Sequence, residues 1–461
     1  MRTVGGERSI MRSAGIAAAF ESDRSVEHAR KVERLASALR LRRSDRPVSL
    51  KKRAVSHQVP KAGDLKYSDE RIDVSELDAI LEIDPGRRLC VAEAGATFAD
   101  LLAATLPLGL APVIVPELKT ITIGGAVSGC SIESMSFMRG GFHDSCVEYE
   151  VVTAKGEVLT CTPDNQHRLL FHMMHGSFGT LGILTRLTFK LCEARPFVHV
   201  EHRRYERIEQ YQQAIAAHAE THDVDFLDGI MHAPDELVLT SGCFVDEAPY
   251  AHRYDWLRVY HRSTRTRTED YLRAHDYYFR YDRGVTRVHP KSLVGRLLFG
   301  KVLGSTQLLR AAEKLRWFLP AEQPNVILDV FVPMGKVAAF MEWYQAELGF
   351  FPLWCVPYRR VQHYPWLSDE FYARTRETLF LDLAIYGMRQ PPGKNCHAII
   401  EQKLLEIGGL KTLISHNYFS EPDFWRIFNK RTYDEVKAVT DPDNIFRDIY
   451  TKTCRASQGL C

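Results

Sequence analysis

A run of glycines and short hydroxyl side chains is the clearest chemical feature of this sequence. In residues 116–136 (PELKTITIGGAVSGCSIESMS) a strand-like Thr-Ile-Thr leads directly into Gly124 and Gly125, and Gly129 follows. Glycine lets backbone N–H groups approach a phosphate closely, because no Cβ stands in the way. The segment therefore predicts a cradle for a diphosphate. It lacks the lysine of a Walker loop, so nucleotide hydrolysis is not expected.

A second glycine cluster follows at Gly176, Gly179 and Gly182 in GSFGTLGIL. A lone glycine pair more often marks a tight turn, but two clusters favour a backbone that passes close to a flat ligand. Neither cluster has the G-x-G-x-x-G spacing after a first strand, with an acid about 20 residues further on, that marks a dinucleotide-binding Rossmann unit. A Rossmann dehydrogenase is therefore the weaker interpretation.

The elements around these clusters alternate between short strands and helices. Residues 88–95 are typical of a strand, 98–106 of a helix and 111–115 of a strand. Residues 147–161 (VEYEVVTAKGEVLTC) predict a hairpin with a Lys-Gly turn. After about residue 195 the chain becomes aromatic and helical, which indicates a second lobe.

The run P-E-L-x-x-I-T-I-G-G-x-x-x-G-x-x-I-E-S, the hairpin and LFHMMHGSFGTLGIL resemble the FAD-binding lobe of the vanillyl-alcohol-oxidase (PCMH-type) superfamily. Within that superfamily the sequence is most similar to the Δ24-sterol reductases. The likeness continues through LRAHDYYFRYDRG (272–284), FPLWCVPYR (351–359), LFLDLAIYG (379–387) and NYFSEPDFWRIF (417–428). It covers residues 45–455.

This resemblance implies an α+β, two-lobed PCMH-type FAD-binding fold with an α/β cap that carries the substrate pocket. We expect an N-terminal tail and basic helix over 1–44 and the FAD-binding domain over 45–195. We expect the cap over 196–420 and a C-terminal segment over 421–461 that returns to the FAD lobe.

The resemblance also implies a non-covalent FAD. The stretch 44–60 holds no glycine, so His57 lacks the glycine-rich context of a covalent flavin anchor. The residues expected to bind the cofactor are Pro116, Glu117, Thr122, Ile123, Gly124, Gly125, Ser128, Gly129, Ser131, Ile132, Glu133, Ser134, Gly179, Thr180, Gly182 and Ile183.

The activity implied is reduction of a C=C bond in a sterol or isoprenoid-like side chain, with NADPH as a transient donor. An unactivated alkene needs an acid to protonate one carbon. Tyr277, Tyr278 and His275, in the basic and aromatic segment TRTRTEDYLRAHDYYFRYDRG, are the candidate donors. A solvated helix with a buried aromatic stripe, or stacking on nucleic acid, are the other interpretations of that segment.

The segment 351–372 is rich in aromatic residues, which suit either the packing of the cap or the lining of an apolar pocket. A large apolar ligand would need such a lining, so the segment favours a lipid substrate over a sugar. Asp382 and Tyr386 fall on one side of a predicted strand, and Tyr386 is a candidate pocket residue. The alternative function is an FAD-dependent alcohol oxidase or dehydrogenase that passes electrons to oxygen or another acceptor.

Charge and composition limit the partners. Lys plus Arg number 60 and Asp plus Glu 58, so the net charge of +2 does not favour nucleic acid. Residues 30–53 hold ten basic against two acidic side chains, and Ser25–Leu41 predicts an amphipathic helix whose other face is basic. Any membrane contact would be peripheral, through this helix. A third hypothesis, supported by the absence of glycine from the stretch 44–60, is a flavin-free scaffold whose basic region 25–53 docks on anionic lipid.

The remaining signals favour a cytoplasmic protein without metal. Ten cysteines are scattered without paired spacing, which indicates reduced thiols, and no export or transmembrane segment is evident. His167, His172 and His175 lack the further ligands that a metal site needs. The oligomeric state is left open.

Overall fold

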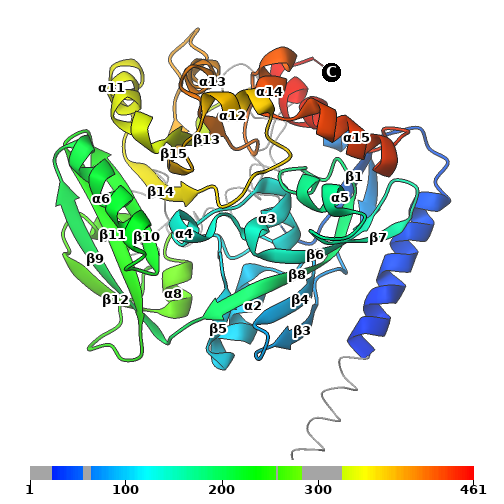
Figure 1. The fold of residues 1–461 in the computed structure, drawn as a ribbon, viewed down its shortest axis with the longest axis horizontal. Coiled ribbons are helices and arrows are strands. Elements are labelled where there is room, and N and C mark those ends of the chain that lie inside the picture. Colours follow the sequence, from blue (N-terminus) through cyan, green and yellow to red (C-terminus); the bar gives the residue numbers. More distant parts are fainter. Residues whose placement is uncertain (1–22, 55–63, 256–257, 283–323, 461) are drawn as a thin grey trace, which may run out of the picture.

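The computed structural model describes residues 23–54, 64–255, 258–282 and 324–460. The N-terminal tail 1–22, His57 and the end of the aromatic motif (283–284) lie outside these residues. Two large antiparallel sheets dominate the described part and helices flank them (Figure 1). The chain is therefore α+β, as expected.

The first large sheet has six strands in the order β3-β4-β8-β6-β7, with β5 paired to β8. Its strands are β3 (Ile80–Asp84), β4 (Leu89–Glu93), β5 (Leu110–Pro112), β6 (Cys146–Val152), β7 (Val158–Cys161) and β8 (Ile183–Glu193). The helices between them are α2 (Phe98–Thr105), α3 (Ile123–Gly129), α4 (Ser136–Arg139) and α5 (Arg168–Met173). A separate parallel pair, β1 (Val48–Lys51) and β2 (Glu70–Asp73), precedes it.

Local signals in this half predict the observed elements. The expected strand at 88–95 is β4, and the expected helix at 98–106 is α2, whose N-cap Thr97 accepts a hydrogen bond from the Asp100 amide. The expected hairpin is β6 and β7, with Gly156 at φ 73° in its turn. The cap of α2 and the turn of the hairpin are formed by residues close together in the sequence. Local sequence patterns therefore predict these elements.

The second large sheet has eight strands in the order β12-β9-β11-β10-β14-β15-β13-β16, all antiparallel. The strands are β9 (Phe197–Tyr205), β10 (Phe226–Ala233), β11 (Glu236–Val245), β12 (Glu269–Arg273), β13 (Val326–Pro333), β14 (Leu353–Arg359), β15 (Leu379–Met388) and β16 (Leu410–Lys411). The helices of this half are α6 (Ile208–Thr221), α7 (Tyr260–Ser263), α8 (Ala274–Tyr278), α11 (Val337–Glu347), α12 (Asp369–Arg374) and α13 (Cys396–Ile407).

The two faces of the eight-stranded sheet differ in chemistry. One face carries aliphatic side chains such as Leu328, Val330 and Leu383, which pack beneath α6, α11 and α13. The alternate residues Phe331 and Trp354 join the core of the six-stranded sheet instead. Because side chains of a strand alternate between faces, the second face of this sheet is turned toward the six-stranded sheet.

The helix at 23–40 packs along the six-stranded sheet (Figure 1). Val32, Leu35 and Leu39 are buried against residues of β1, β2 and β6, so the predicted amphipathic helix is confirmed. In its first turns the apolar Val26, which the amphipathic spacing would bury, is 48% exposed, and His28 is buried instead. Its partners on distant strands, Glu93 of β4 and Glu150 of β6, explain this exchange.

Most of the basic side chains in 30–53 have acidic partners. The pairs are Lys31–Glu93, Arg34–Glu76, Arg40–Glu33, Arg42–Glu70, Lys51–Asp73 and Arg53–Asp78. These contacts offset much of the positive charge of residues 30–53, which weakens the attraction that this region could exert on anionic lipid. Docking on such lipid stays a prediction. Among the described residues no helix is both long and apolar enough to cross a bilayer.

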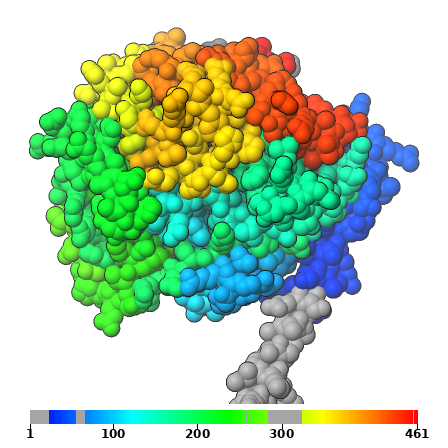
Figure 2. Space-filling view, viewed as in Figure 1, coloured from blue at the N-terminus to red at the C-terminus, as the bar shows by residue number. Residues whose placement is uncertain are grey.

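The C-terminal segment lies against the first half of the chain. Its helices are α14 (Glu421–Ile427), α15 (Lys430–Thr440), the π-helical turn Thr451–Arg455 and α16 (Ala456–Gln458). Helix α15 packs beside α5, and Lys437 Nζ donates to the Thr180 carbonyl at 2.8 Å. Figure 2 shows the segment around α12, in yellow, filling the surface between these red helices and the cyan part of the six-stranded half.

Candidate functional site

The backbone amides of Gly124 and Gly125 are bonded within the protein. Gly124 N donates to the Ala94 carbonyl at 2.9 Å, and Gly125 N donates to Oγ1 of Thr122, the N-cap of α3, at 3.2 Å. A Cβ on Gly124 would stand 2.8 Å from the Ala94 Cβ, so close packing requires this glycine. These two amides therefore donate within the protein, and their binding to a diphosphate stays a prediction.

The second glycine cluster lies directly beside the end of α3. Gly176 N donates to the Val127 carbonyl and Phe178 N donates to the Ser128 carbonyl, both at 3.1 Å. A Cβ added to Gly129 would meet no described atom within 4 Å, and one added to Gly179 would meet only Lys452 Nζ, at 3.9 Å. The free space of the site therefore lies next to Gly129 and Gly179.

Cations gather at the second cluster. Lys452 Nζ donates to the Phe178 carbonyl at 2.7 Å. Burial, followed by the charge of Lys52, lowers the pKa of Lys452 to about 8. The pKa of Lys52 is lowered by the surrounding protein and then by Lys66, although its own side chain is open to solvent. Asp64 and Asp69 offset part of this repulsion at Lys452, and a bound anion would offset more of it.

A cavity opens between the glycine clusters, the eight-stranded sheet and the C-terminal helices. It encloses about 920 Å³ of empty space, its open mouth included. Its wall is mostly apolar and aromatic. The first half of the chain contributes Gly129, Cys130, Ile132, His143, Met173, His175, Gly176, Ser177 and Phe178, and the second contributes Phe331, Tyr358, Tyr364, Trp366, Phe371, Phe380, Leu413, Trp425 and Phe428 among others. Two predicted cofactor-binding residues, Gly129 and Ile132, thus border an apolar space.

Buried acids lie on the face of the eight-stranded sheet that is turned toward the six-stranded sheet. Asp329 pairs across the sheet with Ala384, so it shares this face with Asp382 and Tyr386. Tyr386 Oη donates to Asp329 Oδ1 at 2.6 Å. Burial raises the pKa of Asp329 to about 6. The expectation that Asp382 and Tyr386 fall on one side of a strand is confirmed.

Glu117, one of the predicted cofactor-binding residues, extends this acidic group. Burial raises its pKa to about 8, with smaller contributions from the negative charges of Glu133 and Asp329. Glu117 is therefore protonated at neutral pH and can donate its proton. Asp329 did not emerge from the sequence as a site residue, and a lone acid in an apolar strand was the only signal for it.

Helix α8 carries the three predicted proton donors, and the structure separates them. Tyr277 is buried, and its Oη donates to Ser134 Oγ at 3.5 Å, which places it against the predicted cofactor segment. Tyr278 is buried among aromatic rings. The side chain of His275 is 44% exposed and lies 3.5 Å from Asp276. None of the three is among the residues that border the cavity.

Arg280 explains much of the aromatic motif. Its Nη2 lies 3.1 Å from Asp228 Oδ2 and 3.3 Å from Glu133 Oε1, and all three side chains are almost fully buried. The rings of Tyr277 and Tyr281 stack on its guanidinium at 4.1 and 4.7 Å. Through Arg280 the motif links Glu133 of the Ile-Glu-Ser segment to Asp228 of β10 in the eight-stranded sheet. The sequence did not predict this role.

The histidines at 167–175 do not gather around a metal position. His175 Nε2 lies 3.0 Å from Tyr149 Oη, and burial holds the pKa of His175 well below its usual value. Across the described ranges, no group of three His, Cys, Asp or Glu side chains is arranged to hold a metal ion. His175 instead lies in the wall of the cavity.

Comparison with known proteins places this site in context. Residues 25–162 match the family described as FAD binding domain. Delta(24)-sterol reductase of Homo sapiens is 25% identical over 86% of this chain and 80% of its own length, and that of Arabidopsis thaliana is 25% identical over 83% and 76%. Cytokinin dehydrogenase 8 of Oryza sativa subsp. indica is 34% identical over 30% of this chain and 26% of its own length.

Proposed function

We propose that this protein, a member of the PCMH-type FAD-binding superfamily with similarity to Delta(24)-sterol reductases over most of its length, reduces a C=C bond in a sterol or isoprenoid-like lipid. NADPH would be the electron donor, and the eight-stranded half would act as the cap that holds the substrate. The observation that carries this proposal is the largely apolar cavity that meets the glycine clusters on one side and the eight-stranded sheet on the other.

The residues of the site fit a non-covalent FAD. Lys452 would face its diphosphate, since its ammonium group lies beside the glycine at 179, and the charge of Lys52, which lowers the pKa of Lys452, would add to the attraction. Gly129 leaves room for a group that a side chain would displace. The other predicted cofactor-binding residues between Pro116 and Ser134 stay candidates. Two of them also interact with buried charged side chains: Glu117 with Asp329, and Glu133 with Arg280.

Within this proposal the bound flavin supplies hydride chemistry. The protein holds the substrate in a wall of aromatic side chains and keeps water from the reacting carbon. An alkene reduction also needs a proton at the second carbon. Glu117, protonated at neutral pH, joins Tyr277, Tyr278 and His275 as a candidate source, and Tyr277 is the one of those three that touches the predicted cofactor segment.

An FAD-dependent alcohol oxidase or dehydrogenase is the alternative. The match to a cytokinin dehydrogenase over 30% of this chain supports this alternative. Asp329 bonded to Tyr386 is an acid–phenol pair that suits removal of a hydroxyl proton, because the raised pKa of Asp329 lies near neutrality.

One assay separates the two proposals. FAD-loaded protein is given NADPH and a Δ24-sterol without oxygen, and the product is identified by mass spectrometry. A saturated side chain supports the reductase. Peroxide released from a panel of alcohols in air, with no saturated sterol, would replace it with the oxidase.

A further inference from the structure

Asp382 in β15 is a buried acid that lacks a cation. The residue is 3% exposed, and its Oδ1 has no hydrogen-bond partner among the described residues. Within the described part of the chain, only the backbone amide of Leu383 donates to its carboxyl group. Burial of an uncompensated carboxylate is very costly, so such a group keeps its proton instead. The surroundings of Asp382 therefore favour the neutral acid.

The other buried acids of the described ranges have the partners that Asp382 lacks, because each pairs with a basic side chain or a hydroxyl group. They are Asp69 with Arg447, Glu93 with Lys31, Glu133 and Asp228 with Arg280, Asp270 with Arg267, Asp329 with Tyr386, Glu401 with Lys411 and Asp441 with Lys437. Protein cores that break this rule do so mainly at functional sites, where activity is kept at a cost in stability. The exception at Asp382 therefore indicates a function.

The register of the eight-stranded sheet places Asp382 beside the apolar cavity. Asp382 lies directly opposite Phe331 of β13 and Val356 of β14, and Phe380 precedes it by two residues on the same face. Phe331 and Phe380 both border the cavity. Because the Cβ atoms of directly opposite residues are about 4.5–5.5 Å apart, the carboxyl group of Asp382 lies within about one side chain of that space.

Acids from both halves of the molecule act on the carboxyl group of Asp382. Burial raises the pKa of Asp382 well above its usual value, and the negative charges of Asp329 and Glu117 raise it further. Asp329 shares its face of the sheet, whereas Glu117 belongs to the predicted cofactor segment of the other half. The proton of Asp382 is therefore held where this segment approaches the sheet that borders the cavity.

We propose that Asp382 is the catalytic acid of the site and protonates one carbon of the substrate C=C bond. The inference rests on the proposed function and deepens it, because it gives the direct transfer to Asp382 rather than to Glu117 or a residue of α8. The π bond breaks as one carbon receives the hydride, which is the chemistry that a flavin supplies, and the other receives the Asp382 proton. Asp382 is left as a carboxylate and takes a proton from water once the product has left.

Asp382→Asn removes the proton and keeps the size of the side chain. In FAD-loaded protein without NADPH, the infrared difference between wild type and this variant should contain a protonated carboxyl band that shifts in heavy water. The variant should also unfold at the same urea concentration as wild type or a higher one, because it removes a buried acid that has no cation. Both measurements report on Asp382 without any turnover.

Asp270→Asn is the matched control. Asp270 is also buried and lies in β12 of the same sheet, but His252 and Tyr254 both bond its carboxylate. Loss of these contacts should lower the urea midpoint of the control.

Stopped-flow absorbance then separates the two halves of the reaction. NADPH should bleach the flavin of Asp382→Asn at the wild-type rate. Reoxidation by a Δ24-sterol without oxygen should be about a hundred- to ten-thousandfold slower, because the acid is missing. The Asp270→Asn control should keep the wild-type rate of both steps.

Three results would overturn the proposal: reoxidation of Asp382→Asn at the wild-type rate, an infrared difference without a protonated carboxyl band, or a loss of stability as large as in Asp270→Asn. Failure of the proposed function is a separate outcome. A wild type that forms no saturated sterol would remove the reductase and the catalytic role with it. Saturated sterol formed equally fast by wild type and Asp382→Asn would remove only the role of Asp382.

Discussion

Glu117 shows how its surroundings set the chemistry of one side chain. Burial and the nearby Glu133 and Asp329 raise its pKa from 4.5 to about 8. A carboxyl group that stays protonated at neutral pH can donate a proton where an ordinary glutamate cannot. The same shift makes the stability of the folded protein depend on this group.

Replacing Glu117 by Gln should flatten the dependence of stability on pH. Because the folded pKa is raised, the contribution of Glu117 is fully present below the unfolded value of 4.5 and is lost as the pH rises through about 8. The wild type should lose on the order of a few kcal/mol of unfolding free energy across this window, at about 1.4 kcal/mol per pKa unit.

Urea denaturation of FAD-loaded protein between pH 5 and pH 9 measures this effect. Glu76→Gln, which removes an exposed carboxylate, should retain the wild-type slope. A Glu117→Gln protein with the wild-type slope would show that Glu117 is not the group that titrates.

Arg280 is expected to be essential for stability. Its replacement by Met leaves Glu133 and Asp228 buried without their cation, which should cost about 3–5 kcal/mol. Arg195→Met removes an exposed ion pair with Asp246 and should cost less than about 1 kcal/mol. Chemical denaturation of both variants checks this, and similar small losses would contradict the role assigned to Arg280.

Residue patterns could predict some of these groups and not others. The sequence places Tyr386 and Asp382 on one face of a strand, because strand periodicity is local. It does not show that the amides of Gly124 and Gly125 are used by Ala94 and Thr122, since that depends on packing between segments. Glycine spacing could therefore indicate a candidate site, but not which of its amides already donate within the protein.

At the scale of elements, two glycines of α3 should respond differently to the same change. Gly124→Ala places a methyl group 2.8–2.9 Å from Ala94, so we expect a loss of about 1–3 kcal/mol of stability. Gly129→Ala meets no described atom and should leave the apoprotein as stable as wild type or more so.

FAD titration completes the comparison of the two variants. If the ligand approaches Gly129, the Gly129→Ala protein should bind FAD more weakly while its apoprotein remains stable. A Gly129→Ala protein with unchanged FAD affinity would remove this glycine from the cofactor site.

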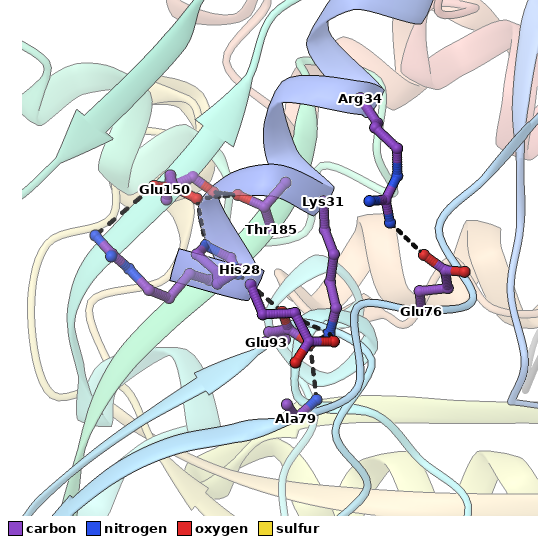
Figure 3. Close-up of polar contacts among 10 residues, drawn as sticks. His28, Lys31, Arg34, Glu76, Ala79, Glu93, Glu150 and Thr185 are labelled. Carbon is purple, nitrogen blue, oxygen red and sulfur yellow. Dashed lines mark hydrogen bonds and ion pairs between the residues drawn. The ribbon is translucent and has the colours of Figure 1, made fainter. Parts of the chain in front are cut away.

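The N-terminal helix is held to the six-stranded sheet by a buried histidine (Figure 3). His28 Nδ1 lies 2.9 Å from Glu93 Oε1, and its Nε2 lies 2.8 Å from Glu150 Oε1. Burial alone would lower the pKa of His28, but the hydrogen bonds to Glu150 and Glu93 outweigh it and raise the pKa. Lys31 and Thr185 bond the same two carboxylates.

The pKa of His28 is higher in the folded protein than its ordinary value of 6.5. Its contribution to the free energy of unfolding is therefore fully present below pH 6.5 and is lost as the pH rises through the raised pKa. Hydrogen exchange in residues 23–40, corrected for the intrinsic rate, should therefore accelerate at alkaline pH. His28→Gln should accelerate exchange at pH 6 as well, because the loss of these hydrogen bonds should lower the free energy of opening the helix by about 1.5–3 kcal/mol.

Arg34→Gln is the control for this helix, since the Arg34–Glu76 pair is exposed and should matter little. Equal exchange in wild type and His28→Gln would contradict the role of the histidine. The helix itself was predictable from its spacing, but the burial of His28 was not, because its partners lie in β4 and β6, far along the chain.

For the whole molecule, the proposed function depends on how the two sheets meet. The eight-stranded sheet turns one face to its own helices and the other to the six-stranded half. The C-terminal helices complete the cavity through residues such as Trp425 and Phe428. Sequence patterns indicated two halves and an apolar cap region, but only the tertiary arrangement shows which aromatic side chains border the space.

The visible spectrum of the purified protein reports whether a bound flavin passes electrons from NADPH to a Δ24-sterol. Under anaerobic conditions we expect a flavin spectrum that NADPH bleaches and that a Δ24-sterol then restores. A colourless protein that takes up no FAD on titration, or a bleached flavin that no Δ24-sterol reoxidises, would contradict the account.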